Sequence, residues 1–71
     1  MYNVAMEFKN RLRELRKANN LSQMQLAEKT GFSQSAIAKW ELGKTEPTAS
    51  AIITLALFFG ETTDFLLGLD D

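Results

Sequence analysis

The chain contains neither cysteine nor histidine among its 71 residues. Without cysteine there are no disulfide bonds or thiolate metal sites, and without histidine the commonest general base and metal ligand is missing. No apolar run approaches the ~20 residues that span a bilayer, and the N-terminus lacks the basic segment and apolar core of a signal peptide. We therefore expect a cytoplasmic protein that is not an enzyme and requires no cofactor or metal.

Basic residues are also absent from the chain after Lys44. The first 45 residues hold eight basic and four acidic residues, hence +4, whereas residues 46–71 hold five acidic residues and no basic one, hence −5; the sum is the net charge of −1. This polarity is typical of a protein that turns one face toward phosphate and another away from it. A solvated surface with unevenly placed charges is the alternative.

Helical periodicity runs through the sequence, and no long alternating run predicts a strand. Serine, threonine, asparagine and glycine stand where helices are expected to begin or end. The predicted helices cover residues 7–18, 23–30, 34–42, 49–59 and 63–67, and residues 1–6 are expected to be loosely ordered. Helices this short are marginal alone, so they must share one core. The expected core residues are Phe8, Leu12, Leu15, Leu26, Ile37, Trp40, Ile52, Leu55, Phe59 and Leu66.

Residues 23–42, QMQLAEKTGFSQSAIAKWEL, predict two amphipathic helices joined by a tight turn. Ala27 lies where the two helices would cross, and Gly31 opens the turn. The apolar residues expected to fix the angle are Leu26, Phe32, Ile37 and Trp40. This arrangement predicts a helix-turn-helix, whose second helix enters a DNA major groove. We interpret Trp40 as a core residue and not as a platform for stacking bases.

The helix predicted over residues 34–42 has an inward apolar side and an outward row of polar and small residues. The outward row consists of Gln34, Ser35, Ala38 and Lys39. Glutamine pairs well with adenine and lysine with guanine, while alanine lets a helix approach the groove closely. Any surface helix shows polar residues, however, so this helix alone leaves both interpretations open.

Three segments together carry a family resemblance: RLRELRKANNLSQ, LAEKTGFSQSAIAKWELGKTEP and LALFFGETTDFLLG. Through them, residues 8–67 resemble the phage repressor and Cro-like helix-turn-helix family. The resemblance implies an all-α, compact five-helix fold of the lambda-repressor type, with residues 1–71 as one domain. It also implies a sequence-specific transcriptional regulator of double-stranded DNA, acting as a repressor.

The same resemblance implies roles for single residues. The expected base contacts are Gln34, Ser35 and Lys39, and the expected phosphate contacts are Gln23, Ser33, Leu42, Lys44 and Thr45. Arg16 and Glu41 resemble the family's structural ion pair, and an inward carboxylate such as Glu41 would be costly without a partner. The alternative for Arg16 is a contact with phosphate. Arg11 and Arg13 are expected to be solvated, with a phosphate contact as the alternative.

Many members of that family carry a second domain for ligand sensing or oligomerisation, and none is evident here. The chain is then either a minimal repressor or the excised reading head of a longer protein. The apolar residues left over after the core is filled are Leu57, Phe58, Leu67 and Leu69. They favour a homodimer, formed in solution or only on DNA, that reads a pseudo-palindromic operator. The alternative function is a protein-interaction module, for instance one that binds a toxin or a polymerase subunit.

Overall fold

The computed structural model describes residues 4–69 and contains five helices and no strand in this range. The helices are α1 (Val4–Ala18), α2 (Gln23–Thr30), α3 (Gln34–Leu42), α4 (Ala49–Phe59) and α5 (Thr63–Leu67). The predicted all-α class is therefore confirmed. No helix within the described range is long and apolar enough to cross a membrane.

The start of α1 differs from the prediction, because the helix begins at Val4 and not at Glu7. An acidic residue such as Glu7 suits a helix N-terminus, and the sequence therefore predicts the start there. Ala5 and Met6 are nevertheless good helix formers, and they extend the helix toward the N-terminus. Of the segment expected to be loosely ordered, residues 4–6 thus belong to α1, whereas residues 1–3 lie outside the described residues.

Each helix from α2 to α5 begins after a serine or threonine whose hydroxyl accepts a hydrogen bond from the first turn. These N-caps are Ser22, Ser33, Thr48 and Thr62. Ser22 forms a capping box with Gln25: the Gln25 amide donates to the Ser22 hydroxyl at 3.0 Å, and the Ser22 amide donates to Gln25 Oε1 at 2.8 Å. Because capping is a local interaction, it sets these boundaries without help from the rest of the fold.

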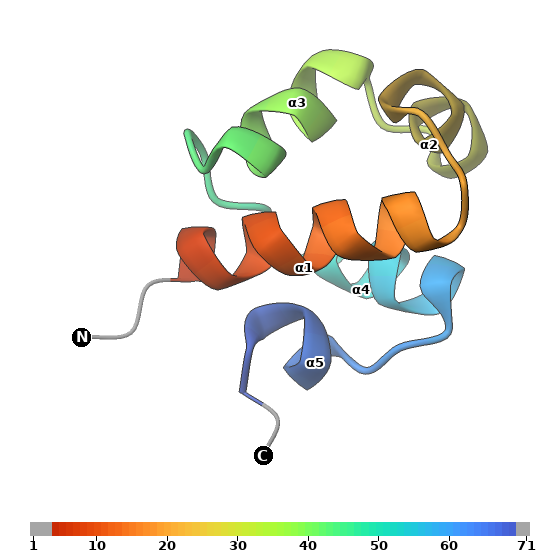
Figure 1. Ribbon diagram of the computed structural model, residues 1–71. Coiled ribbons are helices and arrows are strands. Elements are labelled where there is room, and N and C mark those ends of the chain that lie inside the picture. Colours follow the sequence, from red (N-terminus) through yellow and green to blue (C-terminus); the bar gives the residue numbers. More distant parts are fainter. Residues whose placement is uncertain (1–3, 70–71) are drawn as a thin grey trace.

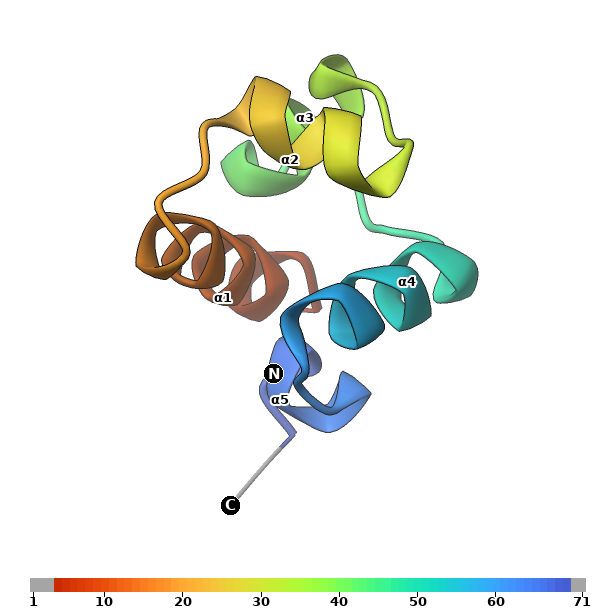
Figure 2. The same cartoon turned by 90° about the vertical axis from the view of Figure 1, so that its right-hand side faces the viewer.

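The helices are arranged in layers (Figure 1). α2 and α3 lie together on one side of α1, and α5 lies on the other side (Figure 1). α4 lies at the same level as α1 and contacts α5 and α2 (Figure 2). The core between the layers consists of Phe8, Leu12, Leu26, Ala27, Ile37, Trp40, Ala51, Leu55, Ala56 and Leu66. This arrangement leaves most of the outer face of α3 uncovered.

The observed core differs from the predicted one in two ways. Leu15, Ile52 and Phe59 are only half-buried and pack against the edge of the core. Ala27, Ala51 and Ala56, which are absent from the expected core list, are 8%, 3% and 4% exposed. Small side chains let helices approach closely, so α4 uses alanine where it meets its neighbours, and the larger residues flank these contacts.

Candidate nucleic-acid interface

The turn between α2 and α3 is built around Gly31. Its φ of 84° lies in the left-handed region that favours glycine, and its amide donates to the Ala27 carbonyl at 2.9 Å. The geometry predicted for a helix-turn-helix at this position is therefore present. The turn is tight enough that α3 follows α2 directly and packs across it.

Aromatic residues fix the position of α3 against the rest of the domain. Trp40 is 8% exposed and meets Phe8 of α1 and Phe32 of the turn edge-on, with ring centroids 6.1 Å and 5.1 Å apart. Edge-to-face pairs of this kind add to the stabilisation from buried area. Trp40 is thus a core residue, as predicted, and its ring is not available for stacking on a base.

The outward side of α3 carries the residues expected to contact bases. Gln34, Ser35 and Lys39 are all exposed, whereas Ile37 and Trp40 on the opposite side are buried. Within residues 4–69, the side chains of the three exposed residues form no hydrogen bond or ion pair. Their donors and acceptors therefore face solvent, and their contacts with bases remain a prediction.

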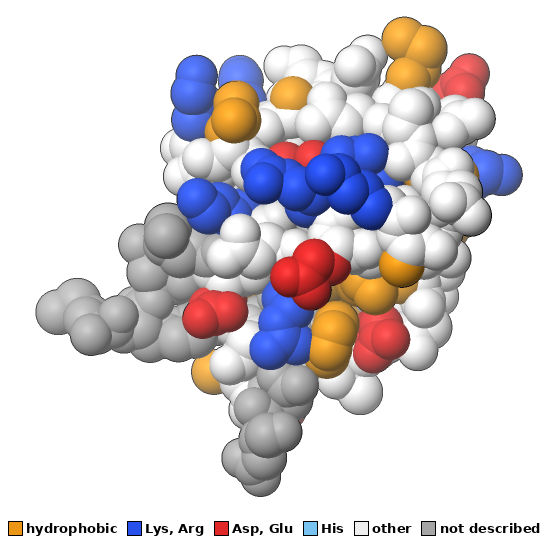
Figure 3. All heavy atoms as spheres, viewed as in Figure 1, with side chains coloured by type: hydrophobic (Ala, Val, Ile, Leu, Met, Phe, Trp, Pro, Cys, Tyr) orange, Lys and Arg blue, Asp and Glu red, His pale blue; other side chains and the backbone are white. Residues whose placement is uncertain are grey.

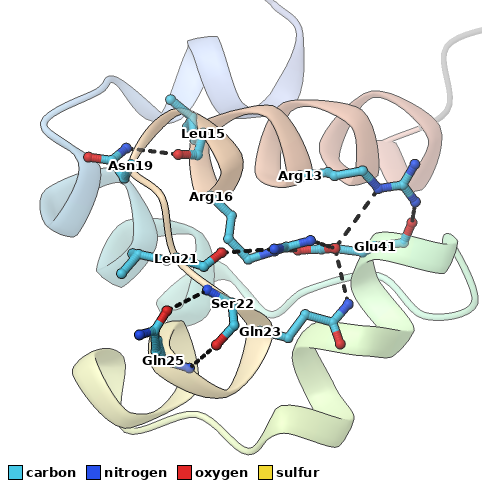
Figure 4. Close-up of polar contacts among 9 residues, drawn as sticks. All are labelled: Arg13, Leu15, Arg16, Asn19, Leu21, Ser22, Gln23, Gln25 and Glu41. Carbon is cyan, nitrogen blue, oxygen red and sulfur yellow. Dashed lines mark hydrogen bonds and ion pairs between the residues drawn. The ribbon is translucent and has the colours of Figure 1, made fainter.

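Glu41 lies at the end of α3 on its inward side and is 2% exposed. Arg16 of α1 binds its carboxylate with two hydrogen bonds, Nε to Oε2 at 2.6 Å and Nη2 to Oε1 at 2.9 Å (Figure 4). Gln23, the first residue of α2, donates from Nε2 to Oε1 at 3.1 Å. The ion pair that the sequence suggested thus exists, and it joins α1, α2 and α3 at one point.

The protonation equilibrium of this pair reflects two opposing effects. Burial alone would raise the pKa of Glu41, but the hydrogen bonds from Arg16 and Gln23 and the nearby positive charges outweigh it and lower the pKa below its usual value. The hydrogen bond to Glu41 likewise raises the pKa of Arg16. Glu41 is therefore held as a carboxylate, and its negative charge is neutralised inside the domain.

Two further bonds extend the Glu41 network. Arg16 Nη1 donates to the Leu21 carbonyl at 2.9 Å, so the loop before α2 is tied to α1. Arg13 Nη2 donates to the Glu41 carbonyl at 2.7 Å, and Arg13 Nε lies 3.9 Å from Glu41 Oε1. Through Arg13, α1 supplies a donor to an unpaired carbonyl at the C-terminal end of α3.

The expectation that Arg11 and Arg13 are simply solvated is therefore wrong. The Arg11 guanidinium lies 4.3 Å from the centre of the Phe65 ring of α5, a cation–π contact. The contact of Arg13 with α3 could have been inferred from the sequence. Residues 13 and 16 lie on the same side of a helix, and Arg16 was already expected to pair with Glu41. No local pattern indicates the contact of Arg11, since it depends on where α5 packs.

The residues expected to contact phosphate lie in two places. Gln23 and Ser33 lie at the start of α2 and α3, but both are already engaged: Gln23 bonds to Glu41, and the Ser33 hydroxyl accepts from the Ala36 amide. The other three, Leu42, Lys44 and Thr45, are exposed at the end of α3 and in the loop that follows. The phosphate contacts of all five residues remain predictions.

The loop after α3 is shaped by its own backbone. The Lys44 amide donates to the Lys39 carbonyl at 3.0 Å as part of the cap around Gly43. The backbone amide of Lys44 is thus engaged within the loop, whereas the side chains of Lys44 and Thr45 are exposed. Basic side chains also gather in a band between α1 and α3 (Figure 3).

Comparisons with known proteins agree with this geometry. The pattern of a helix-turn-helix family matches residues 12–66. The HTH-type transcriptional activator BcrR of Enterococcus faecalis is 45% identical over 62 residues, 87% of this chain and 30% of that protein. The HTH-type transcriptional regulator MJ0272 of Methanocaldococcus jannaschii is 38% identical over 64 residues, 89% of this chain and 97% of that protein.

A solved structure shows the same fold. The restriction-modification controller protein C.AhdI of Aeromonas hydrophila superimposes with a TM-score of 0.79 at 34% identity, covering 87% of this chain and 94% of that one. The chain covers a smaller share of the length of several other relatives: it covers 54% and 56% of two similar regulators of Bacillus subtilis. The sequence relatives are named as HTH-type transcriptional regulators or activators, and the solved structure is named as a restriction-modification controller protein. The resemblance to the repressor and Cro-like proteins is confirmed, and the chain belongs to the helix-turn-helix family.

Proposed function

We propose that this chain is a sequence-specific transcriptional regulator that binds double-stranded DNA by inserting α3 into the major groove. The observation that carries the proposal is the row of Gln34, Ser35 and Lys39, which is exposed along α3 while the opposite side of the helix is buried. Glutamine and lysine supply the hydrogen-bonding groups that distinguish base pairs in that groove. The small Ala38, half-buried beside this row, allows a close approach.

Contacts with the DNA backbone would position α3 on the duplex. Gln23 and Ser33 lie at helix N-termini, where backbone amides and the helix dipole favour an anion. Leu42, Lys44 and Thr45 lie beyond the other end of α3. Phosphate contacts on both sides of the recognition helix would set its register, whereas base contacts would set sequence preference.

We further propose that the protein binds as a two-fold dimer. One recognition helix touches only a few base pairs, and two copies would place their third helices about 34 Å apart to read a pseudo-palindrome. Leu57, Phe58 and Leu69 are 79%, 39% and 55% exposed, and Leu67 is half-buried. These few residues fall well short of the ~1,600 Å² of a stable complex, so we expect the dimer to assemble on DNA.

The expected mode of regulation is repression, by a bound dimer that covers promoter DNA. A reporter gene behind the selected site would test this mode directly. Lower expression in the presence of the protein supports repression. Higher expression would instead indicate an activator, as BcrR is named.

A protein-interaction module is the second candidate function. It is favoured by the lack of basic residues after Lys44 and by the exposed apolar residues of α4. Such a module would bind a protein partner through apolar contacts that salt does not weaken. DNA binding, in contrast, releases counterions from each neutralised phosphate, and its affinity falls steeply as salt rises.

Selection of bound sites from random duplex DNA, followed by a salt titration on the selected site, tests the proposal. We expect enrichment of one pseudo-palindromic sequence, two protein chains per site, and a linear fall of log affinity with log salt concentration. The absence of any enriched sequence would contradict DNA recognition. Enrichment of an asymmetric sequence bound by one chain would contradict only the dimer.

A further inference from the structure

Lys9 of α1 reaches across to the end of α3. It is half-buried, and a Cβ atom added to Gly43 would lie 3.2 Å from Lys9 Cδ. The aliphatic part of the side chain therefore runs along the backbone of Gly43, which caps α3. The ammonium nitrogen lies only two bonds beyond Cδ, so it remains near this end of α3.

Arg13 lies on the same side of α1, one turn after Lys9. Its bond to the Glu41 carbonyl holds the guanidinium at the end of α3, yet its side chain is still 41% exposed. A guanidinium has five N–H donors, and the contacts with Glu41 leave several of them facing solvent. Lys9 and Arg13 therefore both reach the helix end that Lys44 follows in the chain.

The charges at this end of α3 are not balanced. A helix C-terminus attracts cations, which accounts for part of the arrangement, but the one buried acid, Glu41, is already paired with Arg16. Within residues 4–69, neither Lys9 nor Lys44 forms an ion pair. The other acids nearby in the chain are the exposed Glu46, Glu7 and Glu14. The Glu7 side chain lies against Gly68, and Glu14 is not on the side of α1 that Lys9 and Arg13 share. An excess of positive charge thus lies beside the loop that is expected to contact the DNA backbone.

We propose that Lys9 and Arg13 of α1, together with Lys44, form a binding site for a DNA backbone phosphate at the C-terminal end of α3. This inference rests on the proposed function and adds α1 to an interface otherwise assigned to α2, α3 and the loop after α3. The site would strengthen binding to every sequence alike, since phosphate contacts carry no base information. It would also help to fix how far α3 enters the groove.

The test compares the salt dependence of binding to the selected duplex for single variants. Lys9→Gln, Arg13→Gln and Lys44→Gln each remove one of the charges that neutralise this phosphate. The slope of log affinity against log salt should therefore fall by up to about 0.9 per chain, or about 1.8 for a dimer. Lys9→Arg and Arg13→Lys keep the charge and should retain the wild-type slope. The selected sequence should not change.

Lys29→Gln is the matched control, because Lys29 is exposed in the last turn of α2, away from the end of α3 that carries Gly43 (Figure 1). We expect the wild-type slope for this variant. In one outcome, the wild type binds its selected site while Lys9→Gln and Arg13→Gln show the same salt slope as Lys29→Gln. That result would overturn the inference but leave the proposed function intact. A lower thermal midpoint without a change in slope would likewise assign the two residues a purely structural role. Failure of the wild type to bind any duplex would instead refute the proposed function.

Discussion

The two halves of this domain are held together by different kinds of interaction. In α1 to α3, directional hydrogen bonds converge on the buried Glu41 from Arg13, Arg16 and Gln23. In α4 and α5, apolar packing dominates: α4 has the sequence ASAIITLALFF without a charged residue. Hydrogen bonds fix orientation as well as distance, whereas apolar burial is non-directional and stabilises in proportion to area.

The difference indicates a division of roles. A helix that reads DNA must be held at a defined angle, and the Glu41 network ties both neighbours of α3 to it at one point. The second half needs no such precision toward DNA, and it exposes apolar residues such as Leu57, which is 79% exposed. The basic residues lie in the first half only. The first half therefore carries the groups that the proposed DNA recognition needs, and the second half carries apolar packing that stabilises the domain.

The largest expected effect separates buried from exposed leucines in α4. Leu55 is fully buried and Leu57 is not. Leu55→Ala should lower the free energy of unfolding by about 2–5 kcal/mol, because it removes buried methyl groups and leaves a cavity. Leu57→Ala should change it by no more than about 0.5 kcal/mol. Thermal unfolding checks both variants, and equal midpoints would contradict the assignment of the core.

A slightly smaller effect is expected from breaking the Glu41 network. Glu41→Ala leaves Arg16 without its partner in a part-buried position, at a cost of about 3 kcal/mol. In a domain of this size that corresponds to a fall in the thermal midpoint on the order of 10–20 °C. Glu28→Ala, at an exposed position of α2, removes the same side chain and serves as the control. A midpoint for Glu41→Ala that matches the control would show that the network does not stabilise the fold.

The depressed pKa of Glu41 predicts a dependence of stability on pH. A glutamate in the unfolded chain has a pKa of about 4.3, and in the folded domain Glu41 holds its proton less tightly. The stabilisation is therefore complete above that value and is lost as the pH falls through the lower folded pKa. Between about pH 6 and about pH 3, the wild type should lose more stability than Glu41→Gln. Parallel pH profiles for the two proteins would contradict the shift.

Features set by neighbouring residues were predictable from the sequence, and features set by packing were less so. The starts of α2 to α5 follow from Ser22, Ser33, Thr48 and Thr62, because a cap acts within one turn. The pairing of Arg16 with Glu41 was accessible through the family resemblance and the inward position of Glu41.

Three contacts of basic residues in α1 were not predicted from the sequence. They are those of Lys9 with Gly43, Arg13 with Glu41 and Arg11 with Phe65. Each joins residues far apart in the chain, and a long basic side chain on a helix surface gives no sign of which neighbour it will meet. For the same reason, the sequence indicated the outward row of α3 but not the arrangement of basic residues around its end.

The smallest effect on stability is expected at Gln34, and this position tests the central claim most directly. Gln34 is exposed on α3, so Gln34→Ala should change the free energy of unfolding by no more than about 0.5 kcal/mol. Its affinity for the selected site should fall by about 1–3 kcal/mol, with relaxed preference at one base pair of each half-site. The measurement is site selection and affinity for wild type and variant side by side. Identical selected sequences bound with equal affinity would contradict the claim that α3 reads the DNA.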